Sequence, residues 1–456
     1  MSYRCSVVSM AVIEAEGRQY LEGNFEPAGE ERTVTDLAVT GALPADISGR
    51  YVRIGPNPWP VPEGPYHWFT GTGMVHGVEL RDGRAHWYRN RWIRTPEMAA
   101  QLGDPAPTGP PPAMYDGANT NVLGHAGRIL AMTEGAMPYE LTADLETIGR
   151  TDFSAGGGPG VPGFTAHPKI DPVTGELLGF RYWFEEPYAQ YFAIAADGTL
   201  ARSVAVDTTG PVMMHDFSVT ERHAVFYDLP VTFRLDLAMD PSVPFPFAWD
   251  DEYPARLGVL SRTPGEDAVR WFDIDPCYVF HPMNAYEEGD TIVLDVVRYP
   301  DMFRREEVKG NLLDRQSLDR WRIDLAAGKV LTERLDDRAQ EFPQVDPRVV
   351  GRPHRIGYAM SADHGPGALS DGILKHDLAA GTTAKFDAGA GRSPGEASFI
   401  PAGPAEDDGY LVTFVYDAAS DRSDLVLLDA TDMTQVAAVH LPVRVPYGFH
   451  GSWIAD

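Results

Sequence analysis

The chain has 456 residues, 43% of them hydrophobic, which is enough to bury one large core or several smaller ones. It carries 66 Asp and Glu residues against 38 Lys and Arg residues, a formal net charge of -28, so its surface repels nucleic-acid phosphates. We therefore expect no nucleic-acid partner.

The sequence gives no sign of a secretory signal or a membrane span. No uncharged run approaches the roughly 20 residues that cross a bilayer. The short apolar stretch at 7–13 is followed by Glu14 and Glu16, where a signal peptide would need small residues. Cys5 and Cys277, the two cysteines, are interpreted as free thiols in a reducing compartment. We expect a soluble cytoplasmic protein, at most peripheral to a membrane.

Short runs rich in Val, Ile, Phe and Tyr recur along the chain and predict strands. In chain order, a hairpin turn at Asp82-Gly83 comes first, and a helix over 95–102 follows, opened by a cap residue and a proline. The clearest strands then lie at 180–184, 191–195, 223–231, 291–299, 410–416 and 424–429. Turn signals at Asp197-Gly198, Glu288-Gly289-Asp290 and Ala380-Gly381 favour hairpins between strands.

Evenly punctuated strands with few helices indicate an all-β protein, and a sandwich pair, a large barrel and a propeller all fit this pattern. A propeller of seven four-stranded blades, at roughly 60 residues each, matches the length. No linker-like segment divides the chain, so we expect one domain over 1–456, with 1–18 loosely ordered. Blade-to-blade similarity is not visible in the sequence.

Four of the thirteen histidines differ from the rest because their neighbours are apolar or aromatic: His167, His215, His281 and His450. A buried imidazole must form hydrogen bonds or bind a metal, because an unpaired buried polar group costs on the order of 1–3 kcal/mol. Their separations of roughly 50, 65 and 170 residues do not match a zinc finger or one helix turn. They suit ligands that converge on one axis from different blades.

At these residues the chain resembles the carotenoid cleavage oxygenase family, which includes lignostilbene- and isoeugenol-cleaving enzymes. The likeness covers nearly the whole length. It runs through 20–25, 49–58, 73–76, 118–121, the four histidine segments, 341–348 and 395–399. The resemblance implies a seven-bladed β-propeller with a metal on its axis, beneath a helical cap that forms a substrate tunnel.

The resemblance also implies the residues of the site. The family's four ligands fall on the four histidines named above. Its glutamates, which accept the other ring N–H of the last three of these ligands, fall on Glu134, Glu341 and Glu396 in that order. Thr120 falls on the residue that crowds the open side of the metal. Stilbene-cleaving members place a lysine where this chain has Thr133, which argues against a 4-hydroxystilbene substrate.

The tunnel should be lined by aromatic side chains. Phe303 and Phe449 are candidates for its wall, with plain core packing as the alternative. The apolar segment 244–249 is either a rim at which a lipophilic substrate leaves a membrane or a packed insertion between blades.

Four neutral imidazoles leave the metal at charge +2, which favours Fe(II). The expected reaction joins O₂ to a lipophilic or aromatic alkene and gives two carbonyl products without a reductant, flavin or nicotinamide. A carotenoid or apocarotenoid is the favoured substrate, and a phenylpropanoid or stilbene alkene such as isoeugenol is the alternative. An iron-dependent isomerohydrolase is the alternative of another reaction class. A calcium lactonase or a binding scaffold would need oxygen ligands on the axis instead. We expect a monomer or weak oligomer.

Overall fold

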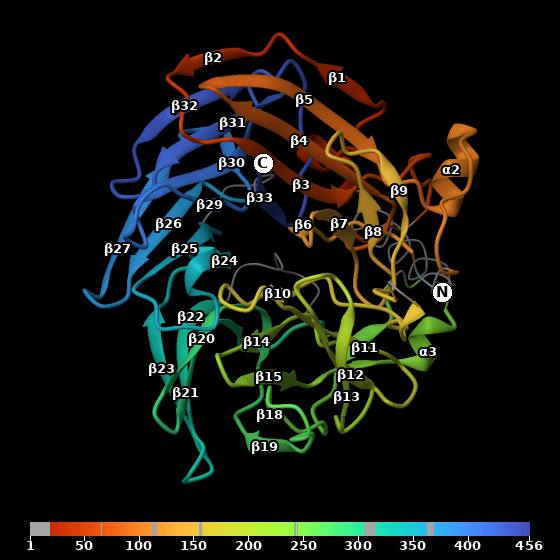
Figure 1. The fold of residues 1–456 in the computed structure, drawn as a ribbon, viewed down its shortest axis with the longest axis vertical. Coiled ribbons are helices and arrows are strands. Elements are labelled where there is room, and N and C mark those ends of the chain that lie inside the picture. The colour runs from red at the N-terminus through yellow and green to blue at the C-terminus, as the bar shows by residue number, and fades with distance from the viewer. Residues whose placement is uncertain are drawn as a thin grey trace, which may run out of the picture.

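Seven antiparallel sheets surround a central axis in the computed structural model, which describes residues 19–64, 66–111, 116–154, 157–240, 243, 245–304, 316–362 and 369–456 (Figure 1). The fold is an all-β, seven-bladed propeller, as the sequence predicted. The expectation for residues 1–18 falls outside the described residues.

Five of the blades are four-stranded sheets. In chain order these are β6 (Asn121–His125), β7 (Arg128–Met132), β8 (Tyr139–Leu141) and β9 (Thr147–Arg150); β10 (Lys169–Ile170), β11 (Leu177–Tyr182), β12 (Ala189–Ile194) and β13 (Leu200–Val206); β14 (Phe217–Val219), β15 (His223–Asp228), β18 (Arg256–Ser261) and β19 (Val269–Asp273); β20 (Tyr278–Glu288), β21 (Thr291–Tyr299), β22 (Ser317–Asp324) and β23 (Lys329–Asp336); and β24 (Gln340–Gln344), β25 (Ile356–Ser361), β26 (Gly372–Asp377) and β27 (Thr382–Asp387). Each sheet begins with its innermost strand.

The two remaining blades share strands from both ends of the described chain, and this closes the ring. One consists of β1 (Arg32–Val34), β3 (Gly49–Pro56), β4 (Gly73–Arg81), β5 (Arg84–Trp92) and the late strand β33 (Gly451–Ala455), which pairs with β3. The other consists of β28 (Arg392–Pro394), β29 (Ser398–Pro401), β30 (Gly409–Asp417), β31 (Arg422–Asp429) and β32 (Gln435–His440), completed by the early strand β2 (Ala38–Gly41). Each of these two blades therefore depends on strands from distant parts of the sequence.

Helices are few and short among the described residues. They are α2 (Pro96–Leu102), α3 (Leu235–Ala238) and the 3-10 turns η1 (Gln19–Leu21), η2 (Gly23–Phe25) and η4 (Pro347–Val349). The helix α2 begins as predicted, because the Thr95 hydroxyl accepts a hydrogen bond from the backbone N–H of Met98 at 3.2 Å. Within the described ranges no helix has both the length and the apolar character to cross a membrane.

The cap over the axis is built from short pieces. A two-stranded sheet of β16 (Val231–Phe233) and β17 (Phe247–Trp249), with α3 between its strands, is inserted into the third four-stranded blade. This insertion, η1 and η2 each contribute a side chain to the cavity over the site described below.

The predicted strands are present, with two differences. The run 223–231 divides into β15 and β16, because Pro230 has no N–H to continue the ladder. The run 180–184 ends at Tyr182, and Trp183 and Phe184 leave the sheet to line the cavity. All four predicted turns have a glycine at positive φ: Gly83 at 68°, Gly198 at 84°, Gly289 at 63° and Gly381 at 63°. Cys277 is a buried free thiol, and Cys5 lies outside the described residues.

The apolar core is distributed among the blade interfaces. Seven clusters of buried side chains each join one pair of neighbouring sheets. For example, Val225 and Tyr227 of one blade pack with Ala285 and Ile292 of the next. Because packing takes place between the sheets, the axis itself is free for polar side chains.

Polar contacts also tie neighbouring blades together. Glu287, near the end of β20, accepts hydrogen bonds from His223 Nδ1 at 2.8 Å and from Thr220 and Arg222 of the preceding blade. Burial alone would raise the pKa of this carboxyl, but these donors outweigh it and lower the pKa to about 2.

Candidate metal centre

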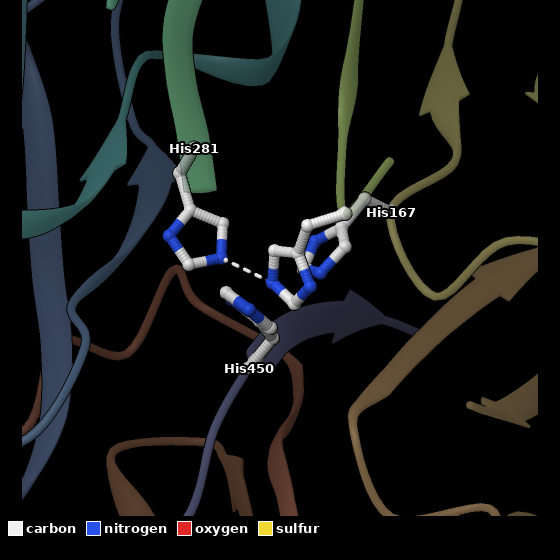
Figure 2. A group of neighbouring side chains, drawn as sticks. His167, His281 and His450 are labelled. Carbon is white, nitrogen blue, oxygen red and sulfur yellow. Dashed lines mark hydrogen bonds between the residues drawn. The ribbon is translucent and has the colours of Figure 1, made fainter. Parts of the chain in front are cut away.

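Four histidine side chains meet on the propeller axis (Figure 2). His167, His281 and His450 are 3%, 7% and 6% exposed, and the side chain of His215 is 10% exposed. One nitrogen from each ring can be chosen so that all four lie within 4.8 Å of one another. His215 Nε2 and His281 Nε2 are 3.1 Å apart. The structure thus brings together all four of the histidines that the sequence singled out.

Each histidine comes from a different blade, at or beside its innermost strand. His167 precedes β10, His215 precedes β14 and His450 directly precedes β33. His281 lies within β20, where the pairing with β21 is irregular between Val279 and Pro282. Proline cannot donate to the ladder, and such a bulge re-aims the side chains beside it. Local breaks in the sheets therefore direct these rings to the axis.

Three glutamates come from the three blades that provide no histidine. Glu341, in β24, accepts a hydrogen bond from His281 Nδ1 at 2.6 Å, and Glu396, between β28 and β29, accepts one from His450 Nδ1 at 2.9 Å. A carboxylate oxygen of Glu134, which follows β7, lies directly against Nδ1 of His215. Because Nδ1 of each of these three rings faces a glutamate, Nε2 of each ring can bind a metal ion at the centre.

A further layer of donors holds the glutamates. The Tyr182 hydroxyl donates to Glu134 at 2.6 Å, the Tyr299 hydroxyl donates to Glu341 at 2.8 Å, and the Gln344 amide donates to Glu396 at 2.7 Å. Sequence reasoning missed these three residues. The only available signal was general: a buried carboxylate has more acceptor sites than one imidazole N–H can fill.

Burial and the neighbouring charges together determine the protonation of the centre. Burial lowers the pKa of His167 and His281 well below the ordinary value, so these imidazoles are neutral, which is the form that binds a metal. Burial raises the pKa of Glu341 to about 7. For Glu134 and Glu396 burial acts in the same direction, but the adjacent imidazoles outweigh it and the pKa of each carboxyl is lowered.

The donor set fits a transition-metal ion. The buried His167 Nε2 has no hydrogen-bond partner among the described residues. Imidazole nitrogens bind such ions at about 2.1 Å, so two ligands of one ion lie at most about 4.2 Å apart. Small ring movements would bring the observed 4.8 Å into that range. Four imidazoles without a carboxylate ligand suit iron and its neighbours rather than calcium.

A cavity of about 370 Å³ lies against His215, His281 and His450. Most of its lining is aromatic: Tyr20, Phe25, Trp68, Phe69, Tyr182, Trp183, Phe184, Phe233, Phe245, Phe247, Phe280, Tyr299, Phe342 and Phe449. Within the described part of the chain, the carboxylates in the lining are Glu134 and Glu341, whose partners are described above. The cavity therefore suits an uncharged, largely apolar molecule.

Three of the four residues expected to form the pocket do line the cavity. Thr120 and Thr133 lie with their hydroxyl oxygens 3.2 Å apart, and Thr120 donates to the side-chain oxygen of Asn119 at 2.9 Å. Phe449 lines the cavity beside them. The prediction that Phe303 lines the cavity is wrong, because Phe303 is not among the lining residues. Its ring packs behind the wall, 5.1 Å from the ring of Phe245.

Comparisons with known proteins agree with this fold and site. The family model described as retinal pigment epithelial membrane protein matches residues 25–455. A "Carotenoid cleavage oxygenase" of Mycobacterium tuberculosis is 44% identical, over 95% of this chain and 97% of the relative. A "Carotenoid 9,10(9',10')-cleavage dioxygenase 1" of Phaseolus vulgaris is 34% identical, over 96% of this chain and 89% of the relative. The chain belongs to this family, that of the carotenoid cleavage oxygenases, as the sequence motifs indicated.

Solved structures of other proteins superimpose on this fold. A lignostilbene dioxygenase of Pseudomonas brassicacearum superimposes with a TM-score of 0.85 at 28% identity, covering 96% of this chain and 98% of that one. A cobalt-substituted apocarotenoid oxygenase of Synechocystis superimposes with a TM-score of 0.83 at 27% identity, covering 96% and 99%.

Proposed function

We propose that this protein is an iron(II)-dependent dioxygenase that cleaves a carbon–carbon double bond of a carotenoid or apocarotenoid. One alkene and one O₂ give two carbonyl products, so the C=C and O=O bonds break, two C=O bonds form, and no external electrons are required. The observation that carries the proposal is the buried quartet of histidines beside an aromatic cavity.

The proposed roles follow from the contacts. The four histidines hold the metal through Nε2, and Glu134, Glu341 and Glu396 keep three of the rings in the required tautomer and orientation. The iron, when bound, supplies the activation of O₂. The aromatic wall excludes water and holds the alkene, and Thr120 and Thr133 narrow the space beside the histidines.

The lining of the cavity supports a long apolar alkene as substrate. It offers extended aromatic surface, and among the described residues it contains no Lys or Arg that would grip a phenolate. Thr133, at the position of the lysine of stilbene-cleaving members, agrees with this choice. A phenylpropanoid or stilbene alkene remains the second candidate, because the lignostilbene dioxygenase has a closely similar fold.

The experiment replaces each histidine of the quartet with alanine, with His86→Ala as the control because that side chain lies on an outer strand. The four variants should lose iron and turnover together, while the control should keep both. Products from an apocarotenal and from isoeugenol, identified by mass, assign the substrate class. Aldehydes formed with consumption of O₂ support the dioxygenase, whereas an isomerised or hydrolysed product without O₂ consumption supports an isomerohydrolase. Full iron content in any one of the four variants would contradict the proposal.

We also propose that the protein touches a lipid surface from which it takes its substrate. Leu235 and Met239, in and directly after α3, are 68% and 77% exposed. They follow β16, whose Phe233 lines the cavity. A Leu235→Ser/Met239→Ser double variant should float less with liposomes while its iron content stays unchanged. Equal flotation of the variant and the parent would contradict this contact.

A further inference from the structure

A second cavity, of about 450 Å³, lies along the axis on the other side of the histidines. Its lining includes residues from β6, β10, β14, β20, β24, β29 and β33, one strand from each of the seven blades. We call it the axial channel. His167 lines only the axial channel and His215 lines only the aromatic cavity, while His281, His450 and Phe342 line both. The quartet and Phe342 thus separate the two spaces.

The axial channel differs in chemistry from the aromatic cavity. Polar side chains line it, among them Asn121, Ser218, Gln344 and Ser452. It also contains an ion pair, Lys169 Nζ to Asp216 Oδ2 at 2.9 Å.

This ion pair lies close to the ligands. Lys169 is two residues after His167, and Asp216 directly follows His215. The Asp216 side chain is 2% exposed and that of Lys169 is 23% exposed. The other charged groups of the lining have partners of their own: Glu396 pairs with His450, and Arg348 pairs with Asp346. Lys169 and Asp216 are therefore a pair of opposite charges in the described lining, and a single substitution in either residue changes the charge of the axial channel.

A hydrated divalent cation loses much solvation energy in an apolar space, and aromatic walls return little of it. The hydroxyl, amide and charged groups among the apolar residues of the axial channel reduce that cost. The channel also leads to three of the four ligands, including His167 Nε2, which has no partner among the described residues.

We propose that the axial channel is the route by which the divalent metal ion reaches the four histidines, and that the Lys169–Asp216 pair controls the rate of its passage. The inference rests on the proposed metal-binding role of the quartet. Replacing Lys169 leaves the Asp216 carboxylate uncompensated, which attracts the ion. Replacing Asp216 leaves the Lys169 ammonium uncompensated, which repels it.

The test measures the rate of Co²⁺ uptake by metal-free protein after rapid mixing, followed by the absorption of the bound ion. At low ionic strength Lys169→Met should accelerate uptake and Asp216→Asn should slow it, each on the order of tenfold, and added salt should reduce both effects. A merely structural ion pair would change both rates in the same direction. Such a common change would overturn the role of the pair.

Two variants that each place a bulky side chain in one of the two cavities test the route itself. Ser452→Trp narrows the axial channel and should slow uptake, whereas Pro246→Trp narrows the aromatic cavity and should leave the rate unchanged. The reverse pattern overturns the inference. Co²⁺ bound at equilibrium is measured for every variant and shows that the fold and the quartet are intact. If the parent binds no Co²⁺ the proposed metal centre fails, whereas normal binding at rates insensitive to the channel overturns only the route.

Discussion

Replacing Tyr299 with phenylalanine removes one hydroxyl from the layer behind the histidines and leaves the shape of the side chain unchanged. That hydroxyl donates to Glu341 at 2.8 Å, and Tyr299 is 1% exposed, so no solvent replaces the lost bond easily. Glu341 keeps its hydrogen bonds from His281 Nδ1 and from the backbone N–H of Phe342, both at 2.6 Å. The buried carboxylate thus loses one of three donors.

The expected size of the effect follows from these contacts. Above the Glu341 pKa of about 7 the acceptor is charged. A hydrogen bond to a charged group contributes about 1.5–3 kcal/mol, and each 1.4 kcal/mol is a factor of ten in affinity. Glu341 orients His281, so part of the free energy lost with this hydrogen bond weakens the binding of the metal by His281. We therefore expect Tyr299→Phe to weaken metal binding about tenfold. Substitution of the residues that hold ligating histidines by hydrogen bonds generally lowers metal affinity or activity about 10- to 100-fold.

The assay is competition for Co²⁺ between the metal-free protein and a chelator of known affinity, without oxygen. Tyr227→Phe is the matched control, because Tyr227 is also buried but its hydroxyl pairs with the neutral Ser218 hydroxyl at 2.6 Å. It should lower the free energy of unfolding by about 1 kcal/mol without changing the affinity for the metal. Equal metal affinity in the Tyr299→Phe variant and the parent, or an equal loss in both variants, would refute this reasoning.

Three further predictions concern packing, charge and the cavity. In Gly55→Ala the new Cβ would lie 2.5 Å from Cα of Gly448, in the segment that carries the fourth histidine. Calorimetry should therefore show that the free energy of unfolding falls by about 1–3 kcal/mol, together with lower metal occupancy. Gly64→Ala, with no neighbouring atom within 4 Å, is the control and should leave both quantities unchanged. The pKa of Glu287 is about 2, below the ordinary 4.5, so its charged form contributes stability that is present above pH 4.5 and is lost as the pH falls through 2. Glu287→Gln should lower the free energy of unfolding by on the order of 1–2 kcal/mol at pH 7. Urea titrations should show that this difference between the variant and the parent vanishes near pH 2. Phe449→Ala removes cavity wall, so kcat/KM for an apocarotenal should fall on the order of tenfold when it is measured per bound iron.

Much of the site could be predicted because its histidines carry a local signal. An imidazole flanked by apolar residues needs a partner, and the motifs around His167, His215, His281 and His450 added the family's ligand pattern. The glutamates followed from the same resemblance. The strands and the helix at 95–102 were predicted from periodicity and cap residues, which are local properties of the chain.

The remainder depends on contacts between distant segments. Tyr182 and Tyr299 support the glutamates from strand ends that nothing in their own neighbourhood distinguishes from core. Phe303 was misplaced because sequence proximity to His281 does not indicate which side of a wall a ring occupies. The pairing of β33 with β3 joins residues about 400 positions apart, and no periodicity predicts it.

The strand β33 has a consequence for how the protein matures. His450 directly precedes it, so the quartet is incomplete until this late part of the chain has been synthesised and has paired with β3. A nascent chain halted before that point holds three of the histidines and an open ring. The proposed metal centre can therefore be completed only at the last step of propeller assembly, when β33 closes the ring.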